Sequence, residues 1–360
     1  MKNKLKNFTD ILIKIKKDNI PFIALLVLLV MYITIAFADF FAIYPSDYSN
    51  RKLAYQPPNN LYLITKDNKI TPLYTYNYTK TFDKETLSIN YKQDRSKKYK
   101  IKFFSKGYEY KLFGLIKCNI HLISKPENCN LFLLGTDVNG HDVYSRLFFG
   151  GQISLTIGFL ALLISFPIGA LYGGISGYLG GKTDKILMRI AEAIMTIPSF
   201  YLLIILASIL PSNMTSKQRF ALITVILAFI GWAGFSRVIR GMVLSIKNRE
   251  YIKAIETIGA SKTRIIIKHI LPQTSSYIII AITLSVPSYI LAESGLSFLG
   301  LGIQLPDASW GNMLKEAQEF ANIIYRPWLL TPGFLIFVAV LSFNVLGDKI
   351  RDILDPKAIK

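Results

Sequence analysis

The stretch that decides the fold reads EYIKAIETIGASKTRIIIKHILP and runs from Glu250 to Pro272. It is the only long basic, amphipathic segment that lies between hydrophobic runs. Isoleucines recur at three-residue spacing and predict one apolar helix face: Ile252, Ile255 and Ile258. Gly259 suits a left-handed helix end, and the Ser261 hydroxyl can cap a second short helix. Proline belongs in a first helical turn, so we expect two short helices around a glycine bend, then a membrane span starting near Pro272.

Short helices are marginal alone in water, so this pair is expected to dock on a partner. The segment resembles the E-A-A…G…I-x-L-P loop of ABC importer permeases, which forms a coupling helix that sits in a groove of the ATPase subunit. The resemblance implies a set of ATPase-coupling residues: Lys253, Ala254, Ile255, Gly259, Ala260, Ser261, His269, Leu271 and Pro272. Lys253 and Ile255 depart from the family's glutamate and second alanine, whereas His269 is similar to the peptide-transporter branch. An ordinary basic cytoplasmic loop is the alternative.

The composition indicates a polytopic membrane protein. Of the 360 residues 51% are hydrophobic, and the mean hydropathy is +0.36. The net charge of +19 is dispersed over loops, which membrane topology explains better than nucleic-acid binding does. The sequence SGYLGGKT, Ser176–Thr183, is only a near miss for a phosphate-binding loop, and the three histidines are scattered. We therefore expect no catalytic residues, no metal site and no cofactor in this chain.

The N-terminal part predicts one membrane span. Residues 1–19 carry lysines from Lys2 to Lys17, and residues 20–43 contain an apolar run long enough to cross a bilayer. Lysines before a span place the N-terminus in the cytoplasm. A cleaved signal peptide is the alternative, because Ala36-Phe37-Ala38 fits a cleavage site, but importer permeases keep this first span.

Residues 44–134 differ from the rest in being rich in Lys, Tyr, Thr and Asn, with alternating stretches between turns. They predict a small strand-rich domain outside the membrane. It is either a solvated spacer or a docking surface for a substrate-binding protein. Cys118 and Cys129, the only cysteines, fall in this insert, and a disulfide between them is left open.

The sequence GTDVNGHDVYSRLFFG, Gly135–Gly150, closely resembles the elbow that precedes the second span of peptide permeases. The elbow residues implied by this resemblance are Gly135, Thr136, Asp137, Gly140, Asp142, Ser145 and Arg146. An EF-hand calcium loop is a poorer match, because its glycine and terminal glutamate are missing at the required spacing. Asp142 and Arg146 are four residues apart and are expected to pair across one helical turn.

Residues 135–360 form the predicted permease core, with five further spans and a cytoplasmic coupling loop at about 237–272. The spans are expected at Ile153–Leu179, Ile190–Leu210, Phe220–Phe235, Ser275–Leu296 and Leu329–Leu346. Gly169, Gly173 and Gly177 lie four apart, a spacing that lets helices approach closely in lipid. Bends are expected at Pro198 and Pro287.

Two carboxylates fall within the predicted spans. Glu192 is three residues after Arg189 and is expected to pair with it. Glu293 lies in AESGLSFLGLG, another stretch similar to peptide permeases, and should pair or face water because a charge in a membrane is costly. Both are candidates for the substrate path or for structural roles. Trp310 and Trp328 are expected in an interface belt.

These resemblances identify the chain as a member of the oligopeptide, dipeptide and nickel ABC importer permeases. They imply an all-α membrane fold with six spans and both termini inside the bacterial cytoplasmic membrane. They also imply a second similar permease, two ATP-binding subunits that hold the ATP, and an extracytoplasmic peptide-binding protein. The expected function is passage of oligopeptides or dipeptides; nickel or another small solute is the alternative. A secondary transporter or channel would need more intramembrane charges, and a membrane-anchored binding protein would not need six spans.

Overall fold

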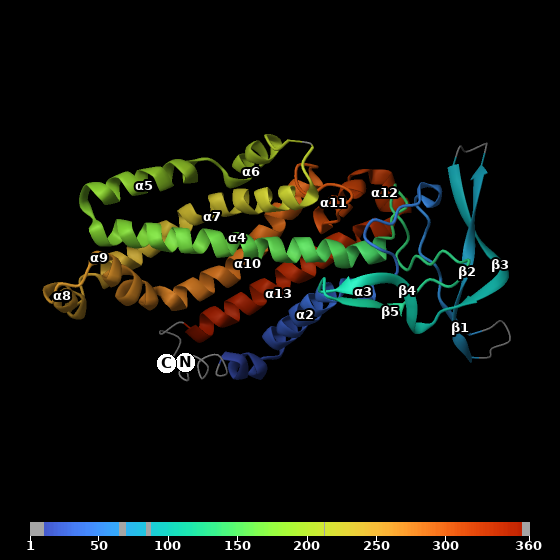
Figure 1. The fold of residues 1–360 in the computed structure, drawn as a ribbon, viewed down its shortest axis with the longest axis horizontal. Coiled ribbons are helices and arrows are strands. Elements are labelled where there is room, and N and C mark those ends of the chain that lie inside the picture. The colour runs from blue at the N-terminus through green and yellow to red at the C-terminus, as the bar shows by residue number, and fades with distance from the viewer. Residues whose placement is uncertain (1–10, 65–69, 84–87, 212, 355–360) are drawn as a thin grey trace. The chain divides into compact units, whose positions relative to one another are not determined.

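The computed structural model describes residues 11–64, 70–83, 88–211 and 213–354 (Figure 1). Its contacts divide the chain into two compact units. The helical unit comprises Met1–Leu29, Leu155–Leu296 and Phe337–Lys360, and the mixed unit comprises Val30–Ser154 and Ser297–Ile336. Much of the lysine-rich N-terminal segment and the end of the tail, residues 1–10 and 355–360, lie outside the described residues.

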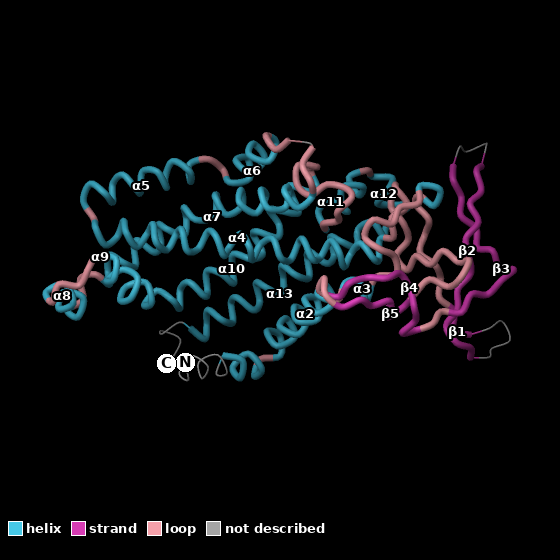
Figure 2. Tube along the Cα trace, viewed as in Figure 1, coloured by secondary structure: helices cyan, strands magenta, loops and turns pink. Residues whose placement is uncertain are grey.

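Five helical runs are long and apolar enough to cross a membrane. They are α2 (Asn19–Ala36), α4 (Val143–Leu179), α7 (Ser216–Ile246), a run over Lys262–Phe298 that ends in α10 (Ser275–Phe298), and a run over Pro327–Leu354 that contains α13 (Thr331–Leu354). A sixth candidate is the bent pair α5 (Gly181–Thr196) and α6 (Ser199–Ser208). The mostly helical fold with up to six spans confirms the expected class (Figure 2).

The helices extend beyond the predicted hydrophobic spans. Helix α4 begins at Val143 rather than Ile153, and α7 continues to Ile246 rather than ending at Phe235. Hydropathy marks only the part of a helix that lipid can surround, whereas the helix itself runs on to its caps. At the start of α7, the Thr215 side chain and Gln218 form a reciprocal capping box.

The two prolines lie in different places relative to the helices. Pro198 lies between α5 and α6, whose axes differ by 82°. This confirms the expected bend, because proline cannot donate the hydrogen bond that would continue the first helix. Pro287 lies inside α10, which continues through it to Phe298.

The glycine spacing on α4 brings this helix against α7 within the helical unit. A Cβ atom on Gly169 would lie 2.8 Å from the Trp232 carbonyl oxygen, and one on Gly173 would lie 2.2 Å from that of Ser236. At Gly177 the added atom would lie 2.8 Å from the Arg240 carbonyl oxygen. Only residues without a side chain allow such an approach, as expected from the sequence.

An ion pair lies at one end of the contact between α4 and α7. Arg240 on α7 donates from Nε and Nη2 to the two carboxylate oxygens of Asp184 on α5, each at 2.5 Å. Ser176 of α4 donates to the same carboxylate at 2.5 Å. Bidentate pairing fixes both distance and orientation, so three helices are tied together at this point.

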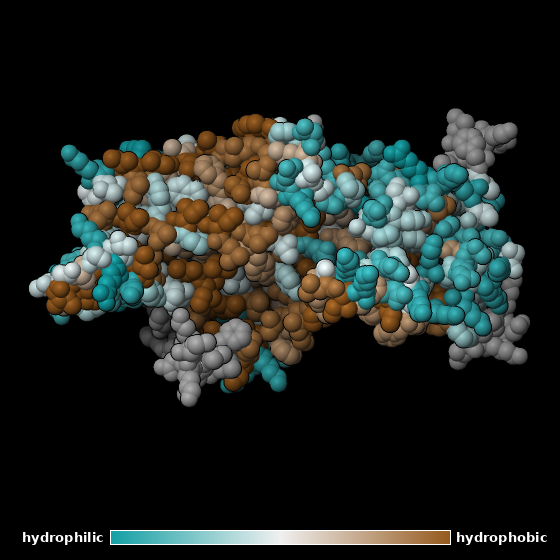
Figure 3. Space-filling model, viewed as in Figure 1, coloured by the Kyte–Doolittle hydropathy of each residue, from teal (hydrophilic) through white to brown (hydrophobic). Residues whose placement is uncertain are grey.

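The mixed unit contains the strands of the insert. Strands β1 (Tyr62–Ile64), β2 (Ile70–Asp83) and β3 (Ser88–Lys100) form an antiparallel sheet in that order, and β4 (Phe103–Leu112) pairs with β5 (Ile116–Ile123) as a hairpin. The small strand-containing insert is thereby confirmed. Figure 3 shows hydrophilic side chains over much of this sheet and hydrophobic ones over the exposed faces of the helical unit.

A small core supports the insert and the segment after it. Its buried residues are Ile43, Tyr44, Ile101, Ile123, Leu131 and Phe132. Cys129 is buried and Cys118 half-buried, and both are free thiols, so the disulfide left open by the sequence is not formed. The short helices of this unit are α3 (Ala38–Phe41), α11 (Trp310–Leu314) and α12 (Phe320–Tyr325).

The tryptophans of the mixed unit are anchors within the protein. Trp310 is 1% exposed, and its Nε1 donates to the Leu147 carbonyl at 2.9 Å. Trp328 donates to the Thr136 carbonyl at 3.0 Å. The expectation of an interface belt is therefore wrong for Trp310, because its ring fills the space beside Gly150 and Gly151.

We predict that Gly173→Ala weakens the packing of α4 on α7. The new methyl group would press on the Ser236 carbonyl, which is backbone and cannot rotate away. Overpacking of this kind costs about 1–3 kcal/mol. The expected result is a lower midpoint of thermal unfolding for the purified protein in detergent.

Gly241→Ala on α7 is the matched control, since a Cβ there meets no atom within 4 Å. Alanine favours a helix over glycine by about 0.5–1 kcal/mol, so this variant should unfold at the same or a higher temperature. Equal midpoints for Gly173→Ala and Gly241→Ala would contradict the close contact.

Candidate functional site

The loop between α7 and α10 has the predicted helix–glycine–helix form. Helix α8 covers Glu250–Thr257, and Gly259 follows with φ of +81°. Helix α9 (Lys262–Arg264) then begins, with the Ser261 hydroxyl accepting from the Arg264 amide at 3.4 Å. The left-handed glycine and the serine cap confirm the local structure read from the sequence.

The second helix of the loop is not separate from the membrane span. Lys262–Phe298 is one helical run, with a π-helical turn over Ile265–Ile270 and a 3-10 turn over Leu271–Thr274. Pro272 lies inside this run and does not start it. The missing proline N–H is accommodated where the hydrogen-bond spacing changes from one helix type to another.

The predicted isoleucine face of α8 is only partly correct. Ile252 is fully buried and Ile255 half-buried, but Ile258 is 82% exposed. A helix advances 100° per residue, so a three-residue spacing drifts by about 60° per step. Helix α8 also ends at Thr257, which leaves Ile258 at the bend beside Gly259.

The loop therefore presents an apolar tip surrounded by charge. Of the predicted coupling residues, five are exposed: Lys253, Ala254, Gly259, Ser261 and Pro272. The other four are half-buried: Ile255, Ala260, His269 and Leu271. Ile258 at this tip is a large aliphatic side chain exposed near Lys253, Lys262 and Arg264.

Hydrogen bonds hold the loop to its own unit. Glu256 of α8 accepts from the Tyr178 hydroxyl of α4 at 2.6 Å. Lys247 at the end of α7 donates to the Gly177 carbonyl at 2.9 Å. Arg249 donates to Gln273 at 2.9 Å, so the chain is also fixed where the loop leads into the helical run. A displacement of α8 would consequently pull on α4 and α7.

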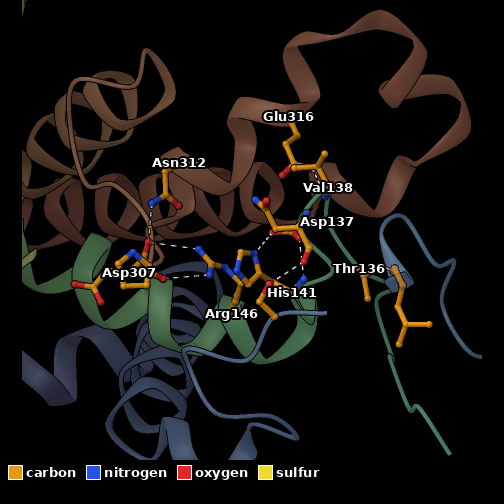
Figure 4. A network of polar contacts seen from close by, with 12 residues as sticks. Thr136, Asp137, Val138, His141, Arg146, Asp307, Asn312 and Glu316 are labelled. Carbon is orange, nitrogen blue, oxygen red and sulfur yellow. Dashed lines mark hydrogen bonds and ion pairs between the residues drawn. The ribbon is translucent and has the colours of Figure 1, made fainter. Parts of the chain in front are cut away.

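The elbow is a tight turn in the mixed unit (Figure 4). Asp137 Oδ1 accepts from the amides of Asn139 and His141 at 2.9 and 2.8 Å, and its Oδ2 lies 2.6 Å from His141 Nδ1. Gly140 has φ of +73°, and a Cβ there would lie 1.9 Å from the Asn50 carbonyl oxygen. The glycine is therefore required both by the backbone conformation and by the lack of space.

Asp142 and Arg146 do not pair, contrary to the prediction. The Asp142 carboxylate caps α4 and accepts from Ser145, at 3.0 Å from its amide and 2.5 Å from its hydroxyl. Arg146 donates to the carbonyls of Pro306 and Asp307 at 3.2 and 3.4 Å. A carboxylate at a helix start is stabilised by nearby amides, which here outweighs the four-residue spacing.

The elbow also organises the residues before it. Ser145 Oγ accepts from the amides of Ile43 and Tyr44 at 2.9 and 3.0 Å. Burial raises the pKa of Asp142 to about 7, although the hydrogen bonds from Ser145 oppose this shift. The elbow residues predicted from the sequence therefore lie close together, and their hydrogen bonds connect the start of α4 to the residues that follow α3.

Glu316 is a member of this cluster that the sequence did not reveal. It accepts from the Val138 amide at 3.0 Å and lines a cavity of about 690 Å³ together with Asp137 and Arg146. Burial, followed by the nearby Asp137 carboxylate, raises the pKa of Glu316 to about 7. Glu316 lies in no motif, so nothing in the sequence marks it as part of this cluster.

The two intramembrane carboxylates do not line the cavity of the helical unit. That cavity, of about 700 Å³, is largely apolar and is bordered by residues such as Phe166, Gly231 and Tyr289. Glu192 lies 3.6 Å from Arg189, which confirms that pair at a partly exposed position. Glu293 is fully buried, with Ser294 Oγ at 3.4 Å from its carboxylate. The described residues contain no group of three His, Cys, Asp or Glu placed to hold a metal ion.

Known proteins are similar in sequence to more than half of this chain. Residues 165–360 match the family described as binding-protein-dependent transport system inner membrane component. The chain is 46% identical over 225 residues to the dipeptide transport system permease protein DppC of Bacillus subtilis (strain 168), covering 62% of this chain and 68% of that protein. It is 40% identical over 254 residues to the oligopeptide transport system permease protein OppC of the same strain, covering 70% and 79%.

A third relative is the oligopeptide transport system permease protein OppC of Haemophilus influenzae, which is 41% identical over 224 residues, covering 62% of this chain and 70% of that protein. The family match spans more than half of the chain and includes the helix–glycine–helix loop and the last predicted spans. The chain therefore belongs to the inner-membrane components of binding-protein-dependent transport systems, among the permeases of the oligopeptide and dipeptide ABC importers.

Proposed function

We propose that this protein is a permease subunit that passes dipeptides or oligopeptides across the membrane in an ABC importer. The relatives named above are permeases of dipeptide and oligopeptide transport systems, and this supports the substrate class. In this proposal the chain binds no ATP itself. It pairs with a second, similar permease, two ATP-binding subunits and an extracytoplasmic peptide-binding protein.

The observation that carries the proposal is the exposed tip of the loop at Ile258. An aliphatic side chain exposed to this degree in an aqueous compartment costs free energy unless a partner covers it. Lys253, Lys262 and Arg264 flank the tip in sequence and are also exposed. An ATP-binding subunit with an apolar groove and an acidic rim would complement this surface.

Coupling requires that the loop and the spans move together. Any ATP-driven change acts on transport only if it favours one membrane state over another. Helix α8 is joined to α4 through Glu256 and Tyr178, and α4 is joined to α7 through the Gly177 carbonyl and Lys247. A shift of the ATP-binding subunit at Ile258 would therefore reach both of these helices without bending the loop.

The path for the peptide is proposed to lie between the two permease subunits. The cavity of the helical unit is bordered mainly by apolar side chains and by small residues such as Gly231, Gly234 and Ser285. A surface of this kind binds weakly to many side chains, which suits a carrier of peptides with varied sequences. Glu192 and Glu293 are given structural roles in this arrangement.

The orientation follows from the charges. The end of α7 and the start of the Lys262–Phe298 run, both assigned to the cytoplasmic side, carry Arg237, Arg240, Lys262 and Lys268, whereas the short external loops carry few such residues. Both termini are accordingly placed in the cytoplasm and the insert on the opposite side.

We predict that an accessibility tag inserted at Asn90 is labelled from outside intact cells and that a tag after Lys360 is not. The basis is the distribution of lysine and arginine over the loops. Labelling of intact cells at the C-terminal tag, or protection of the tag at residue 90, would contradict the proposed orientation.

We also predict that Gly259→Val disrupts the contact of the loop with the ATP-binding subunit. A β-branched residue is strained at φ of +81° by about 1–3 kcal/mol, or roughly 5- to 150-fold in the population of the native bend. In proteoliposomes with the whole transporter, peptide uptake and substrate-stimulated ATP hydrolysis should fall together.

Gly181→Val is the matched control for this variant. Gly181 also has a positive φ, +58°, and a Cβ there meets no atom within 4 Å, but it is the first residue of α5 and lies outside the loop. Its strain should leave coupling much closer to wild type. Normal uptake in Gly259→Val, or equal losses in both variants, would overturn the assignment of the loop as the ATPase contact.

A further inference from the structure

The turn of the β4–β5 hairpin carries a patch of exposed hydrophobic side chains. This hairpin patch consists of Phe113, Leu115 and Ile116, all more than half exposed, at the end where Leu112 pairs with Ile116. Leu115 at the turn is 85% exposed. Figure 3 shows hydrophobic side chains in the region that α3, β4 and β5 occupy in Figure 1. Several large apolar side chains exposed together at one turn are typical of a contact with another phase or molecule.

The hairpin is fixed to the residues that follow α2. The ring of Phe113 meets that of Phe37 edge-on at 5.4 Å between centroids, and Phe104 lies 6.2 Å from Phe40. His121 on β5 lies 2.7 Å from the Asp39 carbonyl oxygen through its Nδ1. These contacts lie within the mixed unit, so the position of the turn relative to the end of α2 is determined.

That position corresponds to the surface of a membrane. Helix α2 has 18 residues, so its length is about 27 Å, close to the thickness of about 30 Å of a hydrocarbon core. It ends at Ala36, one residue before Phe37. If α2 spans the bilayer, Phe37 lies at the boundary between acyl chains and headgroups, and Phe113 beside it lies at the same level.

The charges around the patch match phospholipid headgroups. Lys111 and Lys117 are directly opposite each other across the hairpin, and both are exposed. Like charges in this position destabilise a strand pair unless a counter-charge is present. Neither lysine has an ion-pair partner among the residues that the structure describes, and Glu109 is the single acidic residue between Lys102 and Lys125.

We propose that the β4–β5 hairpin is a lipid-binding element of the insert. Its apolar patch enters the acyl–headgroup boundary of the leaflet at the C-terminal end of α2, and its lysines contact anionic headgroups. A two-stranded hairpin is only marginally stable in water, and contact with lipid on one side and with α3 on the other compensates for this. The inference rests on α2 as a span and not on the transported substrate.

The test places a spin label at the turn of the full chain in nanodiscs. Leu115→Cys is made in a Cys118→Ala, Cys129→Ala background, and a nitroxide is attached. Collisions with oxygen, which concentrates in lipid, are compared with collisions with a water-soluble nickel chelate. Ser96→Cys on β3 is the control, since Ser96 is exposed in the other sheet of the same unit. The label at 115 should report lipid and the label at 96 should report water.

Two outcomes would overturn the proposal. One is equal access of the nickel chelate to positions 115 and 96. The other is shielding of position 115 from oxygen and nickel alike, which would indicate burial against protein. If the cysteine-free background fails to fold, Leu115→Trp in the natural background replaces it, and brominated lipids should quench its added fluorescence; unchanged emission would be equally contradictory.

A charge-reversed variant tests the lysines. In nanodiscs that contain phosphatidylglycerol, Lys111→Glu combined with Lys117→Glu should move the label at 115 from the lipid into water. An unchanged depth in this variant would contradict the headgroup contact.

Discussion

The close contact of α4 with α7 is the constraint on which the helical unit depends. Two helices approach so closely only because Gly169, Gly173 and Gly177 present no side chain to the α7 backbone. The Asp184–Arg240 pair then fixes α5 at the same end. The loop between α7 and α10 is attached to this end by the hydrogen bonds of Lys247 with Gly177 and of Glu256 with Tyr178. Under the proposed function, close packing at the glycines would let a displacement of the loop reach α4 and α7.

The sequence predicted the parts of this arrangement that depend on local chemistry. Glycine at Gly259, the serine cap at Ser261 and the bend at Pro198 each have a backbone reason that acts within a few residues. The glycine spacing on α4 also determined which face would pack closely. The family resemblance of the loop and the elbow supplied the fold, because those motifs occur in a fixed order along the chain.

The predictions that were wrong concern side chains whose contacts are decided by the tertiary structure. The four-residue spacing of Asp142 and Arg146 permits an ion pair, but the amide and hydroxyl of Ser145 are nearer to the carboxylate, and two backbone carbonyls take the guanidinium. Tryptophan is a residue type that is common at membrane interfaces, but Trp310 is instead buried beside Gly150 and Gly151. Glu316 could not be singled out because its partner, the Val138 amide, is far away in sequence.

The insert shows the same division. Alternating residues predicted strands, and the structure has two small sheets, but nothing in the alternation showed that one turn would meet the end of α2. The elbow and the hairpin both hold chain segments at the end of a membrane span, one by hydrogen bonds to Ser145 and the other by ring contacts at Phe37.

The most direct test of the account is the neighbour of Ile258 in the working transporter. A photo-crosslinking residue at this position is introduced into the full complex with its ATP-binding subunits, with Arg95 of β3 as the reference position. The account predicts a crosslink from position 258 to an ATP-binding subunit, with a yield that changes when ATP is added, and no such product from position 95. A complex that takes up peptide in an ATP-dependent manner without any crosslink from position 258 to that subunit would contradict it.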